Sequence, residues 1–127
     1  MNDLLNTLKH EDYCYLTTTG RVTGRPHEIE IWFALNDTTI YLLSGGMDAS
    51  DWVKNLLKNP VVTIRIGEHT FHAAARLVQD EAEQTLARNL LADKYNERKA
   101  NGSLSKWART AWVVGFDVQS IFEEKQP

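Results

Sequence analysis

A glycine-containing segment near the N-terminus, GRVTGRP at residues 20–26, carries the residue types that bind anions. Arg21 and Arg25 supply guanidinium groups, and threonine hydroxyls lie beside them in the sequence at Thr18, Thr19 and Thr23. Guanidinium forks, hydroxyls and accessible backbone N–H groups are what a bound phosphate or carboxylate requires. The segment lacks the G-x-x-x-x-G-K-[ST] and G-x-G-x-x-G phosphate-binding patterns. From composition alone, a solvated hairpin tip is the somewhat favoured alternative to an anion site.

A second candidate binding segment is LSGGMDASDW at residues 43–52. Its glycine pair, Gly45–Gly46, lets a ligand approach the backbone, and the helix predicted after it offers free N–H groups and a favourable dipole to an anion. Asp48 and Asp51 argue against an anion at that position, because they would cap the helix themselves. A structural turn is the more common reason for such a glycine pair.

The other chemistry-bearing residues form no catalytic or metal-binding set. Aromatic planes suit a flat heteroaromatic cofactor, but each of the four tryptophans suits a core or a dimer interface better. They are Trp32, Trp52, Trp107 and Trp112. Four histidines and the single Cys14 are a thin supply of zinc ligands, and His69 and His72 fall on opposite faces of a predicted strand. We therefore expect no metal site, and the spacing of nucleophiles, histidines and carboxylates assigns no catalytic residue.

Size and charge limit the kind of protein this can be. With 127 residues, of which 43% are hydrophobic and 24% charged, residues 1–127 are expected to form a single globular domain. The formal net charge of -3 argues against nucleic acid or an anionic membrane surface as the partner. No apolar run approaches the roughly 20 residues that span a bilayer, and no secretory leader opens the sequence. We therefore expect a cytoplasmic protein.

Alternating and β-branched segments predict about six strands, separated by turns rich in glycine, proline and Asn-Asp. They are residues 13–19, 27–35, 38–44, 61–66, 69–78 and 112–122. Short helices are predicted at 2–9, 51–58 and 104–110, and a long helix is predicted after an Asp80–Glu83 capping box. The apolar stripe of the long helix is predicted to be Ala82, Leu86 and Leu90, with Ala87, Leu91 and Tyr95 alongside. Because the strand spacing is hairpin-like, a mainly β fold with helices (α+β), a six-stranded antiparallel barrel, is favoured over a doubly wound α/β sheet.

Three stretches of the sequence together resemble a known family. They are LTTTGRVTGRPHEIEIWFAL, YLLSGG and DWVKNLLKNPVVTIRIG, which fall within residues 13–67. The combination of T-T-x-G-R-x-[ST]-G-x-P with W-x-x-N-L and N-P is similar to the deazaflavin-dependent nitroreductase and quinone reductase family, one of the flavin and deazaflavin oxidoreductases that also include pyridoxamine 5'-phosphate oxidase. The resemblance implies a split β-barrel that forms a homodimer and holds a flavin-like cofactor in a groove near the subunit interface.

The resemblance also implies which residues bind the cofactor. The two loop arginines would contact its phosphate or acidic tail, and the Ser44–Gly45–Gly46 segment would lie against its isoalloxazine-like ring. Trp52 and Asn55 would hold the loop or the cofactor. With the hydroxyl and aromatic candidates added, the expected cofactor-binding set is Thr19, Arg21, Arg25, Trp32, Ser44, Gly45, Gly46, Trp52 and Asn55.

The activity that the resemblance implies is hydride transfer from a reduced deazaflavin, coenzyme F420, to a small electron-poor acceptor such as a quinone or a nitroaromatic. FMN is the alternative cofactor, used in other branches. Trp52 stands where the oxidase branch has its phosphate-binding Arg and Lys, which favours F420, and the acids of MDASD at 47–51 argue against an acidic cofactor tail passing over that loop. Two other classes stay open: a non-catalytic protein that binds or carries a flavin-like or tetrapyrrole ligand, and a structural domain with an empty groove.

Overall fold

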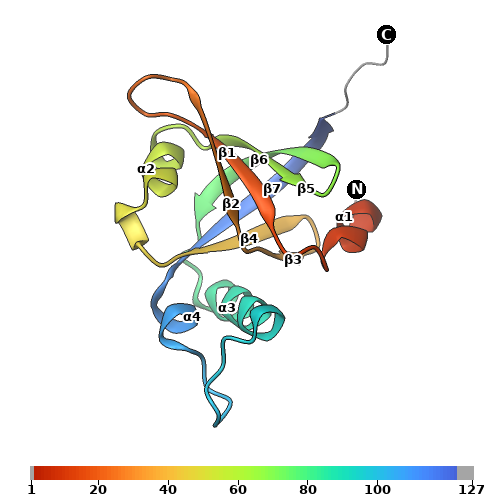
Figure 1. Ribbon diagram of the computed structural model, residues 1–127, viewed down its shortest axis with the longest axis vertical. Coiled ribbons are helices and arrows are strands. Elements are labelled where there is room, and N and C mark those ends of the chain that lie inside the picture. The colour runs from red at the N-terminus through yellow and green to blue at the C-terminus, as the bar shows by residue number, and fades with distance from the viewer. Residues whose placement is uncertain (1, 123–127) are drawn as a thin grey trace.

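The computed structural model describes residues 2–122 and arranges them around one antiparallel sheet (Figure 1). The seven strands follow the order β2-β1-β5-β6-β7-β4-β3. They are β1 (Cys14–Thr19), β2 (Pro26–Ile31), β3 (Ala34–Asn36), β4 (Thr39–Ser44), β5 (Val61–Ile66), β6 (His69–Leu77) and β7 (Trp112–Phe122). Only Trp32 and Phe33 separate the two edge strands, β2 and β3, so the sheet curls back on itself as a split barrel. The mainly β fold expected from the sequence is confirmed.

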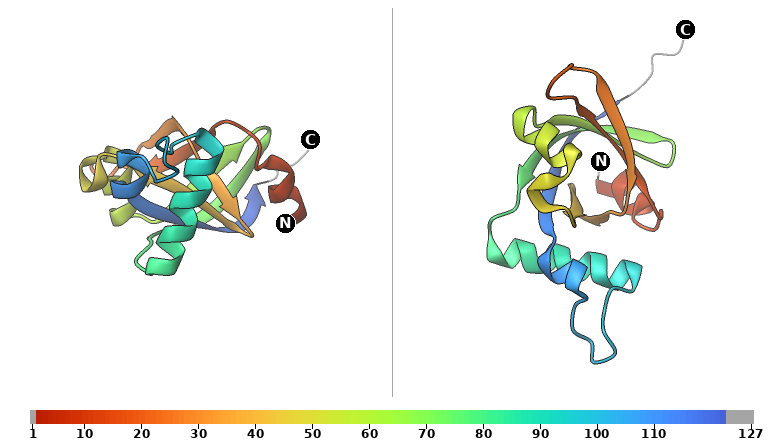
Figure 2. Two further views of the ribbon diagram at one scale, coloured as in Figure 1. Left: turned by 90° about the horizontal axis from the view of Figure 1, so that it is seen from below. Right: turned by 60° about the vertical axis from the view of Figure 1, so that its left-hand side comes forward.

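The helices lie around this barrel (Figure 2). α3 (Glu81–Tyr95) and α4 (Lys106–Thr110) lie together on one side of it. α2 (Asp51–Lys58) follows the 3-10 turn η1 (Met47–Ala49) and lies beside the β1–β2 loop, and α1 (Asn2–Leu8) lies on the side away from α2. No helix within residues 2–122 is both long enough and apolar enough to cross a membrane.

The barrel core forms because the strands alternate between buried and more exposed side chains. In β1 the buried positions are Cys14, Leu16 and Thr18, and β5 repeats the pattern. Burial raises the pKa of the Cys14 thiol to about 12, so this residue is a small core side chain rather than a reactive thiol. A second core lies between the sheet and α3 and consists of Ala34, Tyr41, Leu43, Val78, Ala87, Leu91, Ala111 and Val113.

The strand predicted at 27–35 is divided in two, which gives seven strands instead of six. The backbone N–H of Phe33 donates to Tyr95 Oη at 3.0 Å, and its carbonyl accepts a hydrogen bond from Lys94 Nζ at 3.0 Å. Because both backbone groups of Phe33 bond to the end of α3, they are not available to a neighbouring strand, and the sheet breaks at Trp32–Phe33.

α3 buries only part of the predicted stripe: Ala87 and Leu91 are buried as predicted, and Ala82 and Leu86 are not. Its buried residues are Ala87, Leu91 and Ala92, whereas Ala82 is exposed and 39% of Leu86 is exposed. The buried face of the helix therefore consists of two alanines and one leucine. The predicted cap is confirmed, since the Asp80 carboxylate accepts a hydrogen bond from the N–H of Glu83 at 2.9 Å.

The side chain of Glu83 does not complete the capping box but anchors α3 to the sheet. Arg76 donates from Nη1 and Nη2 to the two oxygens of Glu83 at 2.8 and 2.7 Å, and from Nε to Asp117 Oδ2 at 2.7 Å. Tyr41 Oη donates to Glu83 Oε2 at 2.5 Å. The hydrogen bonds from Arg76, and then from Tyr41, lower the pKa of Glu83 to about 2. This cluster ties α3 to β4, β6 and β7.

Candidate functional site

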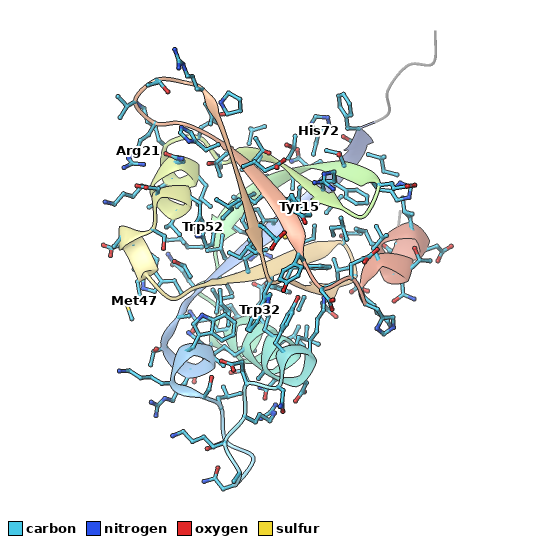
Figure 3. The ribbon with its side chains drawn as sticks, viewed as in Figure 1. Tyr15, Arg21, Trp32, Met47, Trp52 and His72 are labelled. Carbon is cyan, nitrogen blue, oxygen red and sulfur yellow. The ribbon has the colours of Figure 1, made fainter. Side chains whose placement is uncertain are left out.

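Two adjoining hollows lie along β2 and share Trp52. The loop hollow, of about 420 Å³, is lined by Thr18, Gly20, Arg21, Val22, Thr23, His27, Glu28, Ile29, Asp51, Trp52 and Asn55. The aromatic hollow, of about 520 Å³, is lined by Tyr13, Glu30, Ile31, Trp32, Leu43, Ser44, Gly45, Trp52, Glu97 and Trp107. Figure 3 shows Trp52 between Arg21 and Trp32. Successive residues of β2 line first one hollow and then the other, so the two are neighbouring parts of one groove.

Arg21 is docked on α2. Its Nη1 and its backbone N–H donate to Asn55 Oδ1 at 2.9 and 3.2 Å, and its Nη2 donates to Asp51 Oδ1 at 3.1 Å. Asn55, which is buried, donates from Nδ2 to Thr18 Oγ1 at 3.1 Å, and Lys58 Nζ donates to the carbonyl of Arg21 at 2.7 Å. The loop is therefore fixed to the helix at Arg21 and is not a free hairpin tip there.

The other arginine of the loop projects into solvent. The backbone of Arg25 is held, because its N–H donates to Thr23 Oγ1 at 3.2 Å and its carbonyl accepts from the N–H of Gly20 at 2.7 Å. Gly24 has a φ of 74°, a conformation that favours glycine. The Arg25 guanidinium has no ion-pair partner among residues 2–122, so it is the loop cation that is available to an external anion.

Thr19 faces away from the loop hollow. Successive residues of a strand point to opposite faces, so Thr18 lines the loop hollow while Thr19 lines a third hollow of about 420 Å³. Lys58 and Asn59 line that third hollow together with residues 19–24. The predicted hydroxyl ligand Thr19 is thus separated from most of the other predicted residues.

The walls of the aromatic hollow are held by aromatic stacking. The rings of Trp32 and Tyr95 are stacked, with centroids 4.3 Å apart and an interplanar angle of 6°. Trp107 meets Trp32 edge-on, with centroids 5.5 Å apart at 85°. Burial raises the pKa of Tyr95 to about 12, so its hydroxyl stays protonated and donates to the carbonyl of Asp12 at 2.8 Å. These contacts form a rigid flat-sided pocket of the kind that accepts a planar molecule.

Two carboxylates give the aromatic hollow its charge. Glu30 Oε2 accepts from Tyr15 Oη at 2.7 Å, and this hydrogen bond is the main cause of the raised pKa of Tyr15. Glu97 Oε1 accepts from Ser105 Oγ at 3.2 Å. The lining residues include neither Lys nor Arg, so the lining carries a net negative charge, which favours neutral or cationic molecules. Within residues 2–122, no group of three or more His, Cys, Asp or Glu is placed to hold a metal ion.

The glycine pair has two different roles. A Cβ on Gly46 would lie 2.6 Å from Ser50 Oγ, so a side chain there would displace the Ser50 hydroxyl. That serine oxygen shares a hydrogen bond of 2.8 Å with Ser44 Oγ. A Cβ on Gly45 would lie 3.2 Å from the Trp107 ring, and Gly45 lines the aromatic hollow. The backbone at Gly45 is therefore the surface that a ligand can approach.

Of the nine residues predicted to bind a cofactor, six line the loop and aromatic hollows. They are Arg21, Trp32, Ser44, Gly45, Trp52 and Asn55. Thr19 lines the third hollow instead, and Arg25 and Gly46 line none of the three. Sequence reasoning does not place Tyr13, Glu97 or Trp107 in the site. The tryptophan content is the one signal for Trp107, whose position depends on how α4 packs.

Comparison with solved structures shows that the same fold occurs at low sequence identity. An F420-H2 dependent reductase, FDR-A, is 18% identical with a TM-score of 0.66, over 83% of this chain and 93% of that chain. The heme storage protein HutZ from Vibrio cholerae is 18% identical with a TM-score of 0.70, over 94% of this chain and 91% of its own. An FAD-binding protein from Mesorhizobium loti is 12% identical with a TM-score of 0.67, over 94% of this chain and 89% of that chain. These similarities establish the fold alone.

The sequence itself identifies the family. Comparison with curated proteins gave no match. The sequence model of the F420H(2)-dependent quinone reductase family matches residues 3–104, a span that contains all nine predicted cofactor-binding residues and Glu97. The expected family resemblance is confirmed, and with it F420 as the cofactor on which that family depends. The chain belongs to the F420H(2)-dependent quinone reductase family.

Proposed function

We propose that the protein binds F420 across the loop and aromatic hollows and reduces a small electron-poor acceptor, such as a quinone or a nitroaromatic. The observation that supports this most directly is the shared residue Trp52, which joins a flat aromatic pocket to a loop that carries cations. A cofactor with a planar ring and an anionic tail has these same two parts. FMN, which also has a ring and a phosphate, is the alternative cofactor.

The residues present suit both parts of such a cofactor. At the aromatic end, the ring would lie against Gly45, which has no side chain, with Ser44 beside it and tryptophans as the walls. At the loop end, Arg21 lines the loop hollow with the carboxylates of Asp51 and Glu28, Lys58 lines the third hollow beside it, and Arg25 is exposed on the same loop. The anionic tail would meet Arg25 and Lys58 where the loop opens to solvent, outside the two carboxylates.

When bound, reduced F420 supplies the hydride, so the protein's part is to bind, to orient and to exclude water. Trp32, Trp52 and Trp107 would orient a flat acceptor and keep water away from it, because their rings make up much of the apolar wall. The loop cations would fix the anionic tail and so set the position of the ring. No side chain of the groove is assigned a proton transfer.

Anaerobic mixing of the purified protein with oxidised and reduced F420, and separately with oxidised and reduced FMN, tests this function. We expect saturable binding of F420 that is tighter than binding of FMN, and oxidation of reduced F420 when menadione or a nitroaromatic is added. Absence of F420 binding would contradict the proposal. Tight binding without turnover would instead support the second candidate, a non-catalytic carrier of the cofactor.

We also propose that two single-domain subunits form a homodimer. Apolar side chains are exposed on the loop, at the end of α2 and at the start of β5, where Val22 is 88%, Leu57 54% and Val61 61% exposed. The segments that carry them adjoin, because Val22 lines the third hollow together with Lys58 and Asn59, and exposed apolar side chains on adjoining segments mark a surface that associates with another protein. Light scattering after size-exclusion chromatography should give twice the mass of the chain, and a monomer at micromolar concentration would contradict the proposal.

A further inference from the structure

A further hollow lies where the end of β6, the start of β7 and α3 meet. Its volume is about 260 Å³, and it is lined by Leu77, Val78, Gln79, Gln84, Arg88, Trp112 and Val113. None of these residues lines the loop hollow or the aromatic hollow, so this pocket is separate from the proposed cofactor groove. We call it the α3 hollow. Its size suits a molecule much smaller than a flavin-like cofactor.

Arg88 is the charged residue of the α3 hollow, and its charge is not balanced by the protein. Its Nη1 donates to the carbonyl of Ala108 at 2.9 Å, which leaves the other N–H groups of the guanidinium for other acceptors. None of the ion pairs within residues 2–122 involves Arg88. The guanidinium is half-buried, and burial lowers its pKa with no carboxylate to oppose the effect. A half-buried cation of this kind is stabilised by an anion from outside.

The other walls of the α3 hollow indicate what kind of molecule could accompany an anionic group there. Leu77, Val78, Trp112 and Val113 are apolar, and the indole of Trp112 offers a flat surface. Gln84 Nε2 is engaged by the carbonyl of Val78 at 2.8 Å, so its amide is held in place. The pocket therefore combines one cation with apolar walls, whereas a site for a free phosphate would require several donors.

We propose that the α3 hollow binds a small monocarboxylic acid with a flat apolar body, its carboxylate on Arg88 and its body against Trp112. A guanidinium matches a carboxylate with two parallel hydrogen bonds. The site does not depend on the function proposed for the groove along β2.

The test is a titration of the full chain in which the NMR signal of the Trp112 indole N–H is the readout. A Trp112→Phe variant, which lacks this signal, assigns it. The probes are benzoate and its neutral isostere benzamide at constant ionic strength. We expect benzoate to give a saturable shift and benzamide to bind at least tenfold more weakly. Arg88→Gln should weaken benzoate binding by about 10- to 150-fold, as for the loss of a charge-assisted hydrogen bond. Arg88→Lys keeps the charge but not the two parallel hydrogen bonds, so its affinity for benzoate should lie between those of the wild type and Arg88→Gln.

Arg109→Gln is the matched control, because Arg109 is exposed on neighbouring α4 and does not line the hollow. It removes the same charge and should change benzoate affinity less than twofold. Equal losses in the Arg88 and Arg109 variants would overturn the proposal in favour of general electrostatic attraction. Equal binding of benzoate and benzamide to the wild-type protein would also overturn it, and this comparison needs no variant to fold.

Discussion

The guanidinium of Arg21 donates to the carboxylate of Asp51 at 3.1 Å, so one cation of the proposed cofactor site already holds an anion of the protein. The side chain of Asp51 is 83% exposed. Exposed ion pairs contribute little to stability, so another anion can replace this carboxylate at small cost. Asp51 therefore acts as an internal competitor for the position that the phosphate of a cofactor would take beside Arg21.

Replacing this competitor should strengthen cofactor binding. Asp51→Asn keeps the size of the side chain and removes its charge, and we expect F420 to bind about two- to fivefold more tightly, the range that corresponds to an exposed ion pair. Fluorescence titration at low and high salt measures the change, which should shrink at high salt. Asp48→Asn removes a charge from the same segment, from a residue that lines neither hollow, and should have a smaller effect. Weaker binding by Asp51→Asn would contradict this interpretation.

The two loop arginines should separate binding from stability. Arg25→Ala should weaken F420 binding by about 10- to 150-fold, because a charge-assisted hydrogen bond to phosphate contributes roughly 1.5–3 kcal/mol. Its thermal unfolding should match the wild type, since the Arg25 side chain is exposed. Isothermal titration and circular dichroism measure the two quantities on the same samples.

Arg21→Ala should instead lower both affinity and stability. The substitution leaves the buried Asn55 Oδ1 with the backbone N–H of residue 21 as its partner and removes the shorter bond at 2.9 Å. We expect the free energy of unfolding to fall by about 1 kcal/mol. Unchanged F420 affinity in both arginine variants would show that the loop does not bind the cofactor.

The charge of the aromatic hollow should select among acceptors. Glu97→Gln removes one of its two carboxylates, so reduction of an anionic naphthoquinone sulfonate should rise about two- to fivefold relative to a neutral naphthoquinone. The ratio of kcat/KM for the two acceptors is the measurement. Glu81→Gln, at an exposed position in the first turn of α3, is the control and should leave the ratio unchanged. No change in the ratio for Glu97→Gln would place the acceptor elsewhere.

Acid should destabilise the protein through Glu83. The folded state lowers the pKa of Glu83 from 4.5 to about 2, so its stabilising contribution is present above pH 4.5 and is lost as the pH falls toward 2. With Arg76 39% exposed, we expect a contribution of about 1–3 kcal/mol at neutral pH. Urea unfolding of Glu83→Gln should show this loss at pH 7 and a weaker dependence on pH between 4.5 and 2. Glu81→Gln should follow the wild-type curve.

The fold could be predicted from local patterns because most strands are defined by their own alternation. Strand β5 was predicted with its observed ends, and β7 likewise. The break at Phe33 could not be predicted, since its cause is Tyr95, 62 residues further along the chain. The predicted apolar stripe of α3 was right at Ala87 and Leu91 and wrong at Leu86 for a related reason. Helical spacing allows several faces to be buried, and the residue that anchors one of them to the sheet is Arg76 on β6.

The site was predictable where motif residues are close in sequence and not where folding brings distant segments together. The motif placed Arg21 and Asn55 in the site, but their direct contact spans 34 residues and shows in no spacing rule. Glu97 and Trp107 come from the segment after α3 and from α4, whose positions depend on the packing of the helices against the sheet. Sequence reasoning therefore named residues that line both hollows, and missed those that distant segments bring to the aromatic hollow.

The stack of Trp32 on Tyr95 has a consequence for how tightly a ligand can bind. Tyr95 is bonded to the backbone of Phe33 and Asp12, so the aromatic wall is assembled in the free protein. A preorganised wall loses little conformational entropy when a planar molecule arrives, and more of the contact energy is retained as affinity. Loosening that wall, by Tyr95→Leu for example, would make the protein order the wall again at each binding event.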